Sequence, residues 1–176
     1  MTENATSGTT DTGSTNTGRA GGTVTYRGAV FPWELDHMGH MNVRHYVGKF
    51  DEATWTFFAE NGLAPPYLRE ANRGMAAVEQ NLRYMKELHA GDVVRVVTHL
   101  YEAAARKIRF EHRMYDDVTG ELAATCELTG VHLDTVARRA VPFEDAVMAK
   151  LEARLARDRD ALRGRHLRYD TGVRRA

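Results

Sequence analysis

Hydrophobic positions along the chain follow two different periods, and the change from one to the other divides the sequence into elements. Apolar and polar side chains alternate in residues 24–30, which predicts a strand. Over residues 46–58 the apolar positions recur every three or four residues, which is typical of a helix with one buried stripe. The Asn61–Gly62 pair predicts the end of this helix, because glycine readily adopts the left-handed backbone that terminates many helices.

Long strand-like runs follow this helix and are separated by tight turns. They cover residues 73–88, 93–102, 107–115 and 121–134. After Pro142, a second helix is predicted over Phe143–Arg159, where Val147, Leu151 and Leu155 are in register. One apolar helix followed by long antiparallel strands is typical of an α+β domain in which the sheet wraps around one central helix.

The two ends of the chain depart from this pattern. Residues 1–22 are rich in Thr, Gly, Ser and Asn, so they are expected to form a disordered leader. The folded domain is predicted over residues 23–160, and residues 161–176 are expected to be a basic tail that frays. Neither a secretory leader nor a run of eighteen apolar residues is present, so we expect a cytoplasmic protein with no membrane partner.

Charge and cysteine content exclude several classes of function. The 176 residues carry 24 basic and 24 acidic side chains, so no net field attracts nucleic acid, and no recognition motif accompanies the basic end. The single cysteine, Cys126, excludes an internal disulfide and a cysteine-based zinc cluster. Because Cys126 lies in a predicted strand, we expect a buried thiol and not a nucleophile.

Candidate chemistry is concentrated in residues 33–46, which read W-E-L-D-H-M-G-H-M-N-V-R-H-Y. Asp36 ends a strand, Gly39 permits a tight turn, and a helix starts a few residues later. Unpaired N–H groups at a helix start can polarise a carbonyl oxygen. A carboxylate beside them can act on the same carbonyl as nucleophile or general base. The alternative is an aspartate that only forms a turn before the helix.

This segment resembles the D-x-x-G-H-x-N-x-x-x-Y signature of hot-dog-fold acyl-CoA thioesterases. It is most similar to the 4-hydroxybenzoyl-CoA thioesterase-like subgroup of bacterial enzymes, and the likeness includes Phe50–Trp55 and covers roughly Thr23–Arg159. The resemblance implies a hot-dog fold and hydrolysis of a CoA thioester to a free acid and CoA, without a metal or other cofactor. It also implies a homodimer, often doubled into a homotetramer, with each active site at a subunit interface.

The same resemblance assigns catalytic roles to five positions. Asp36 corresponds to the catalytic aspartate, Gly39 to the turn glycine, and the amide of Val43 to the N–H that polarises the thioester carbonyl. His40 and Asn42 correspond to positions that line or brace the site. Many relatives carry a second asparagine where this chain has Val43, which makes substrate preference unsafe to transfer.

Four further residues are expected to contact the substrate. Tyr46 matches a position that lines or braces the site, and Arg106 and Lys107 fall where CoA phosphates are often bound in the family. Trp33 lies just before the acidic residue and is expected to wall the acyl pocket. A cluster of aromatic rings there would also suit a cationic acyl group such as a trimethylammonium.

Other functions remain open from the sequence. The same fold serves thioesterases that act on acyl-carrier protein in polyketide or fatty-acid biosynthesis, and a non-catalytic domain could bind acyl-CoA without hydrolysing it. His37, His40 and His45 cluster in the sequence, and imidazole suits zinc. Their spacing matches no two-histidine helix motif and no cysteine joins them, so no metal site is predicted.

Overall fold

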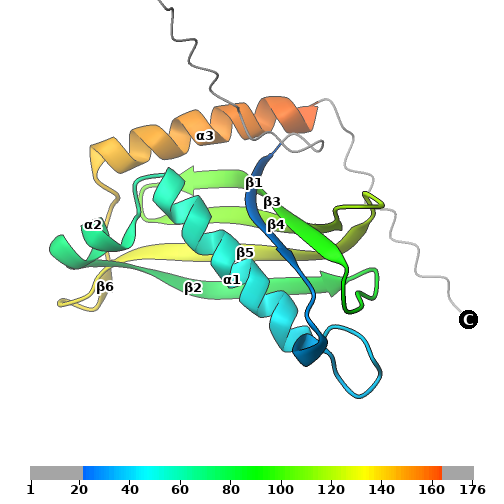
Figure 1. Ribbon diagram of the computed structural model, residues 1–176. Helices are drawn as coiled ribbons and strands as arrows, with labels where there is room; N and C mark the ends of the chain where they lie inside the picture. The colour runs from blue at the N-terminus through cyan, green and yellow to red at the C-terminus, as the bar shows by residue number, and fades with distance from the viewer. Residues whose placement is uncertain (1–21, 164–176) are drawn as a thin grey trace, which may run out of the picture.

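The computed structural model of the protein describes residues 22–163 (Figure 1). The strands are β1 Thr23–Ala29, β2 Arg73–Tyr84, β3 Val93–Ala104, β4 Lys107–Asp116, β5 Leu122–Asp134 and β6 Arg139–Ala140. The helices are α1 Val43–Glu60, α2 Pro65–Glu70 and α3 Asp145–Arg163, with a short 3-10 turn at Pro32–Glu34. The expected leader and tail lie outside the described residues, except for Gly22 and for residues 161–163, which belong to α3.

One antiparallel sheet carries the fold. Its strands are ordered β1-β3-β4-β5-β2, and β6 pairs with β5. Figure 1 shows α1 crossing one face of this sheet, while α3 runs along it near β3. The α+β architecture expected from the sequence, a long antiparallel sheet around one central helix, is confirmed. Within residues 22–163, no helix is long and apolar enough to cross a membrane.

The helix α1 is held in place by its apolar stripe and by the residues at its ends. Phe50, Ala53 and Phe57 are almost fully buried in the core. At the start, Asn42 is the N-cap, because its side-chain oxygen accepts a hydrogen bond from the N–H of Arg44 at 3.1 Å. At the end, Gly62 has a φ of +84°, the left-handed geometry expected from the sequence.

Helix α3 closes part of one sheet edge. Strand β1 pairs with β3 only as far as Thr98, so the backbone of β3 beyond that point lacks a strand partner on this side. Asp158 Oδ2 accepts a hydrogen bond from the Leu100 N–H at 2.8 Å, and Arg154 donates to the Thr98 carbonyl at 2.9 Å. Arg154 and Asp158 also form a buried ion pair at 2.8 Å. Side chains of a helix therefore replace strand hydrogen bonds at this edge.

The strand predicted over residues 73–88 is shorter in the structure, because β2 ends at Tyr84. The N–H groups of Met85 and Lys86 both point to the carbonyl of Ala123, which interrupts the ladder. Residues 85–92 then form what we call the β2–β3 connector. Leu88, at its centre, is completely buried, and its carbonyl accepts a hydrogen bond from the Met41 N–H at 2.7 Å. The connector is thereby attached to the chain just before α1.

Candidate active site

The segment predicted to carry chemistry forms a closed loop directly before α1. Leu35 and Met41 pair as a short antiparallel bridge, and residues 36–40 between them form what we call the Asp36 loop. The Asp36 N–H donates to the His40 carbonyl at 2.9 Å, which closes the loop. Gly39 has a φ of +81°, a conformation that glycine adopts without steric cost. The turn expected from the sequence is therefore present.

The Asp36 carboxylate is ionised, and only one of its two oxygens accepts hydrogen bonds from the described residues. Its Oδ1 accepts hydrogen bonds from the N–H groups of Met38 at 2.8 Å and His40 at 3.4 Å. The Met38 N–H lowers the pKa of Asp36 below its ordinary value of 3.8, against the opposing effect of desolvation. None of the hydrogen bonds among residues 22–163 uses Oδ2. The turn-forming geometry and an oxygen free for chemistry thus coexist in one side chain.

The start of α1 leaves one amide open. Asn42 accepts the N–H of Arg44 through its side chain and the N–H of His45 through its carbonyl, at 3.1 and 2.9 Å. Within the described part of the chain, the N–H of Val43 has no hydrogen-bond partner. Since unpaired amides at a helix start carry partial positive charge, Val43 N–H can stabilise a developing negative charge on oxygen.

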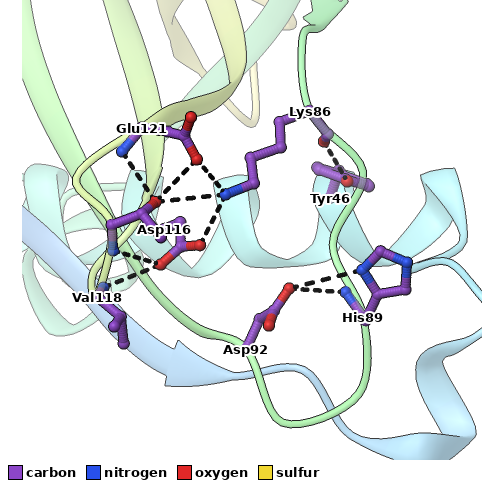
Figure 2. A network of polar contacts seen from close by, with 8 residues as sticks. Tyr46, Lys86, His89, Asp92, Asp116, Val118 and Glu121 are labelled. Carbon is purple, nitrogen blue, oxygen red and sulfur yellow. Dashed lines mark hydrogen bonds and ion pairs between the residues drawn. The ribbon is translucent and has the colours of Figure 1, made fainter.

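Tyr46 braces the site from within the core. Its hydroxyl donates to the Lys86 carbonyl at 3.2 Å, as Figure 2 shows, and burial raises the pKa of Tyr46 to about 12. The ring also packs edge-on against Tyr84. Tyr46 therefore joins α1 to the β2–β3 connector as a neutral phenol. The sequence predicted that this position lines or braces the site, and the hydrogen bond to the connector is the contact through which it would brace it.

Three of the expected substrate-binding residues lie away from the Asp36 loop or point into solvent. Trp33 is 70% exposed and stacks on Phe31 with ring centroids 4.6 Å apart, and its expected place in the wall of an acyl pocket stays a prediction. Arg106 and Lys107 lie at the turn after β3, at the opposite end of a 12-residue strand that spans about 40 Å. Their expected binding of the CoA phosphates stays a prediction.

A cavity of about 460 Å³ lies beside α1. On the helix side it is lined by Arg44, Val47, Gly48, Asp51, Thr54, Trp55 and Phe58, and on the sheet side by residues of β2, β4 and β5. None of the residues expected to form the site lines it, but it begins at Arg44, the neighbour of Val43. Asp51 has no ion-pair or hydrogen-bond partner in the described part of the chain. Trp55 is half-exposed toward the same space.

Comparisons with known proteins show the family of this chain. The model of the thioesterase-like superfamily matches residues 30–151, which include the Asp36 loop, α1 and the long strands. The chain belongs to this superfamily. A betainyl-CoA thioesterase of Pseudomonas aeruginosa is 28% identical over 130 residues, covering 74% of this chain and 82% of that protein.

Longer relatives in the superfamily share only one part with this chain. An L-carnitine dehydrogenase/betainyl-CoA thioesterase of Ruegeria pomeroyi is 30% identical over 147 residues, which is 84% of this chain and 28% of that protein. The relative with the same name in Rhizobium meliloti is 29% identical over 118 residues. The match covers 67% of this chain and 24% of that protein, so the chain spans about a quarter of the length of these relatives.

Solved structures of other proteins share the thioesterase-like fold. A Staphylococcus aureus protein in complex with CoA superposes with a TM-score of 0.74 at 20% identity, covering 78% of this chain and 87% of that one. A 1,4-dihydroxy-2-naphthoyl-CoA thioesterase of Synechocystis gives a TM-score of 0.66 at 16% identity, over 73% and 94% of the two chains. At these identities the likeness concerns the fold.

Sequence reasoning missed a buried ion pair that positions the site of this thioesterase-like protein. Lys49 Nζ lies 2.8 Å from Glu34 Oε1, and Glu34 Oε2 accepts the Phe31 N–H at 2.9 Å. The pair joins the 3-10 turn before the Asp36 loop to the second turn of α1. A signal was present, because Lys49 lies between Tyr46 and Phe50 on the apolar face of the predicted helix, where an unpaired lysine would be costly.

Proposed function

We propose that the protein is an acyl-CoA thioesterase that hydrolyses a CoA thioester to a carboxylic acid and CoA. The observation that carries this proposal is the ionised Asp36 carboxylate with a free Oδ2, in a loop that leads directly to the open Val43 N–H. Relatives named as thioesterases and the match to the superfamily support it. The partly exposed loop also leaves Asp36 within reach of a substrate from solvent.

In this mechanism the Asp36 carboxylate and the Val43 N–H act on the same thioester carbonyl, the first at its carbon side and the second at its oxygen. As general base, Asp36 takes a proton from water, which attacks the thioester carbon while the Val43 N–H stabilises the oxyanion. The tetrahedral intermediate then expels the CoA thiolate, which takes up a proton. As nucleophile, Asp36 would instead attack the thioester carbon and expel the CoA thiolate, which takes up a proton; water would then hydrolyse the resulting anhydride to the free acid and regenerate the Asp36 carboxylate. Both routes need the same ionised carboxylate.

A second copy of the chain completes this site in the proposed enzyme. Strand β2 is 12 residues long, pairs on one side with β5, and is largely exposed. A long open strand edge favours pairing with another strand. Antiparallel pairing of two β2 strands would place the Arg73 end of one beside the Tyr84 end of the other. We infer a homodimer that forms through β2. Two such dimers can associate into a tetramer.

This pairing also gives Arg106 and Lys107 a use. The Arg106 carbonyl accepts the His132 N–H at 2.9 Å, and His132 lies opposite Met75 of β2, so the two cations belong to the Arg73 end. In the antiparallel dimer, this end lies beside the partner's Asp36 loop. The two cations would then bind the phosphates of a CoA held by the other subunit.

We propose that the acyl group of the substrate carries a positive charge. Asp51 supplies an unpaired carboxylate and Trp55 an aromatic ring in the same space, a pairing that attracts quaternary ammonium groups. The names of the relatives point to the same class, since several are betainyl-CoA thioesterases. We therefore propose betainyl-CoA or a similar cationic acyl-CoA as substrate, with neutral acyl-CoA and acyl-carrier substrates as the alternatives to be measured.

The catalytic role of Asp36 is tested by the variant Asp36→Asn. Removing the charge should lower kcat for thioester hydrolysis by about 100-fold or more, the size expected for loss of a general base. The oligomeric state and the melting temperature should stay close to those of the wild type. Hydrolysis at the wild-type rate by this variant would contradict the mechanism, and tight acyl-CoA binding by a wild type that releases no thiol would indicate a binding domain.

The cationic preference is tested with a pair of substrates that differ only in charge. Betainyl-CoA and 3,3-dimethylbutyryl-CoA have the same shape, but the second lacks the positive charge. We expect the wild type to have a higher kcat/KM for betainyl-CoA than for 3,3-dimethylbutyryl-CoA. Asp51→Asn should lower kcat/KM about tenfold for betainyl-CoA and leave the value for the neutral substrate unchanged. Equal values for the two substrates in the wild type would exclude charge recognition. The same acyl groups on carrier protein test the carrier alternative.

A further inference from the structure

Three metal-ligating side chains meet beside the Asp36 loop, in a group that the proposed mechanism does not use. His40 belongs to the loop, and Glu87 and His89 belong to the β2–β3 connector. The ligand atoms of the three lie within 4.8 Å of one another. His40 Nε2 is 3.2 Å from Glu87 Oε2, and the rings of His40 and His89 meet edge-on with centroids 5.0 Å apart. No other group of this kind occurs among residues 22–163.

The backbone on both sides imposes this arrangement. Glu87 and His89 flank the buried Leu88, so both side chains project outward from the connector toward the loop. The Leu88 carbonyl accepts the Met41 N–H at 2.7 Å, which fixes the connector against the residue that follows His40. The group therefore does not depend on chance contacts of mobile side chains.

The start of the connector is anchored independently. Lys86 Nζ donates to Asp116 Oδ2 at 2.9 Å and contacts Glu121, and the Lys86 carbonyl accepts from Tyr46 (Figure 2). These contacts hold the backbone from which Glu87 projects.

A fourth residue, Asp92, holds the backbone of His89 and lies near its ring. Asp92 Oδ2 accepts the backbone N–H of His89 at 2.8 Å and lies 4.0 Å from His89 Nδ1, as Figure 2 shows. A carboxylate is a common outer partner of a metal-bound histidine, and Asp92 lies close enough to take this position after a small movement of either side chain.

We propose that His40, Glu87 and His89 bind a divalent transition-metal ion of the zinc class. Two imidazoles and one carboxylate are a ligand set with which proteins hold Zn²⁺ while a further position stays open. Mg²⁺ and Ca²⁺ prefer oxygen ligands and should not compete. The site differs from the cluster His37, His40 and His45 considered from the sequence, because His45 faces Glu34 at 3.6 Å and His37 points into solvent.

Binding at this site restrains the Asp36 loop. The His40 N–H is one of the two donors to Asp36 Oδ1, so a metal on the His40 ring would hold the catalytic carboxylate through its own backbone. The metal ion would also link the Asp36 loop to the β2–β3 connector, because its ligands come from both segments. We expect bound Zn²⁺ to slow hydrolysis, and this effect, unlike the metal site itself, rests on the proposed thioesterase function.

The metal site is tested by zinc titration of the untagged, chelator-treated full chain in competition with a chromophoric chelator. The wild type should bind one Zn²⁺ per chain. Glu87→Gln and His89→Gln should each weaken binding by about tenfold or more, since even outer partners of metal ligands are worth ~10–100-fold. The matched control His37→Gln changes a neighbouring exposed histidine and should bind zinc as the wild type does.

The effect on turnover is followed by the ultraviolet absorbance of the thioester, because released CoA thiol itself binds zinc. Without zinc, Glu87→Gln and His89→Gln should hydrolyse substrate as the wild type does, and zinc should slow only the wild type and His37→Gln. The metal site is overturned if the wild type binds no zinc, or if Glu87→Gln and His89→Gln bind it equally well. Since binding is measured without substrate, a protein without thioesterase activity would still decide the question.

Discussion

Glu34 and Lys49 form an ion pair that is almost completely withdrawn from solvent, with side chains 11% and 5% exposed. Burial, the largest single effect, would raise the pKa of Glu34, but the hydrogen bonds from Lys49 and from the Phe31 N–H, together with the nearby positive charge, lower the pKa overall. Lys49 also donates to the Ala29 carbonyl at 3.2 Å. One side chain thus joins the end of β1, the 3-10 turn and α1, around the segment that presents Asp36.

Replacing this lysine should therefore destabilise the whole domain. In Lys49→Met the Glu34 carboxylate stays buried without its lysine partner, and breaking a buried ion pair in this way costs about 3–5 kcal/mol. Urea denaturation at neutral pH measures the loss of unfolding free energy. The double variant Glu34→Gln, Lys49→Met also removes the buried negative charge. It should recover part of the unfolding free energy lost in Lys49→Met. Unchanged stability of Lys49→Met would show that solvent reaches Glu34.

The residues of the site differ in how far the sequence could predict them. Asp36, Gly39 and Val43 were predictable because they are neighbours in the chain, and a turn followed by a helix start needs no tertiary contact. Glu87 joins His40 only after the sheet has formed, so no local pattern could place it there. Asp51 was missed because an acidic residue on an amphipathic helix is most often simply solvated.

The β2–β3 connector is the element whose anchoring matters most for the site. Asp116 Oδ1 accepts the N–H groups of Val118 and Thr119 at 2.9 and 3.0 Å, and its Oδ2 binds Lys86. The Thr119 N–H and Lys86 together lower the pKa of Asp116 to about 2. This carboxylate therefore fixes both the β4–β5 turn and the start of the connector.

The lowered pKa of Asp116 gives a pH-dependent prediction. Because its folded value is below the ordinary 3.8, its stabilising effect is complete above about pH 4 and is lost as pH falls toward 2. At neutral pH, Asp116→Asn should lower the unfolding free energy by about 2 kcal/mol. The difference from the wild type should shrink below pH 4 in denaturant titrations. A difference that stays constant down to pH 2 would contradict this.

For the helices and strands, the sequence predicted the type of each element better than the residues at which it begins and ends. The helix α1 and the strands β1, β3, β4 and β5 follow from their periodicity. Strand β2 was predicted to reach Leu88, because residues 85–88 continue the alternation although their backbone has left the ladder. The short helix α2 was missed, since prolines at its start read equally well as a linker.

For the whole molecule, the proposed dimer makes a testable statement about β2. A two-fold axis through this strand would place its middle beside the same residues of the partner, and Val78 lies there with 61% of its surface exposed. Val78→Glu would bring extra like charges together and should yield monomers in light-scattering measurements. Monomers should also lose activity, because Arg106 and Lys107 would no longer reach the other loop.

The control for this variant is a substitution of the same kind far from β2. Val136→Glu adds the same charge at an exposed position in the turn after β5 and should leave the oligomeric state unchanged. A Val78→Glu protein that remains dimeric would place the interface elsewhere. The resemblance to known thioesterases predicted an oligomer, but periodicity alone could not, because an open strand edge becomes visible only when the strand order is known.

The unequal edges of the sheet also limit how large an assembly can grow. At the β1 side, a seven-residue strand with an irregular register is followed by the stretch of β3 that Arg154 and Asp158 cover. Among the strands within residues 22–163, only β2 offers a long edge for strand addition. When two copies pair through β2, the long unpaired edge of each is covered by the other. Further strand addition to the sheet therefore stops at the dimer. The same arrangement that completes a site therefore protects a strand-rich protein against polymerising into fibres.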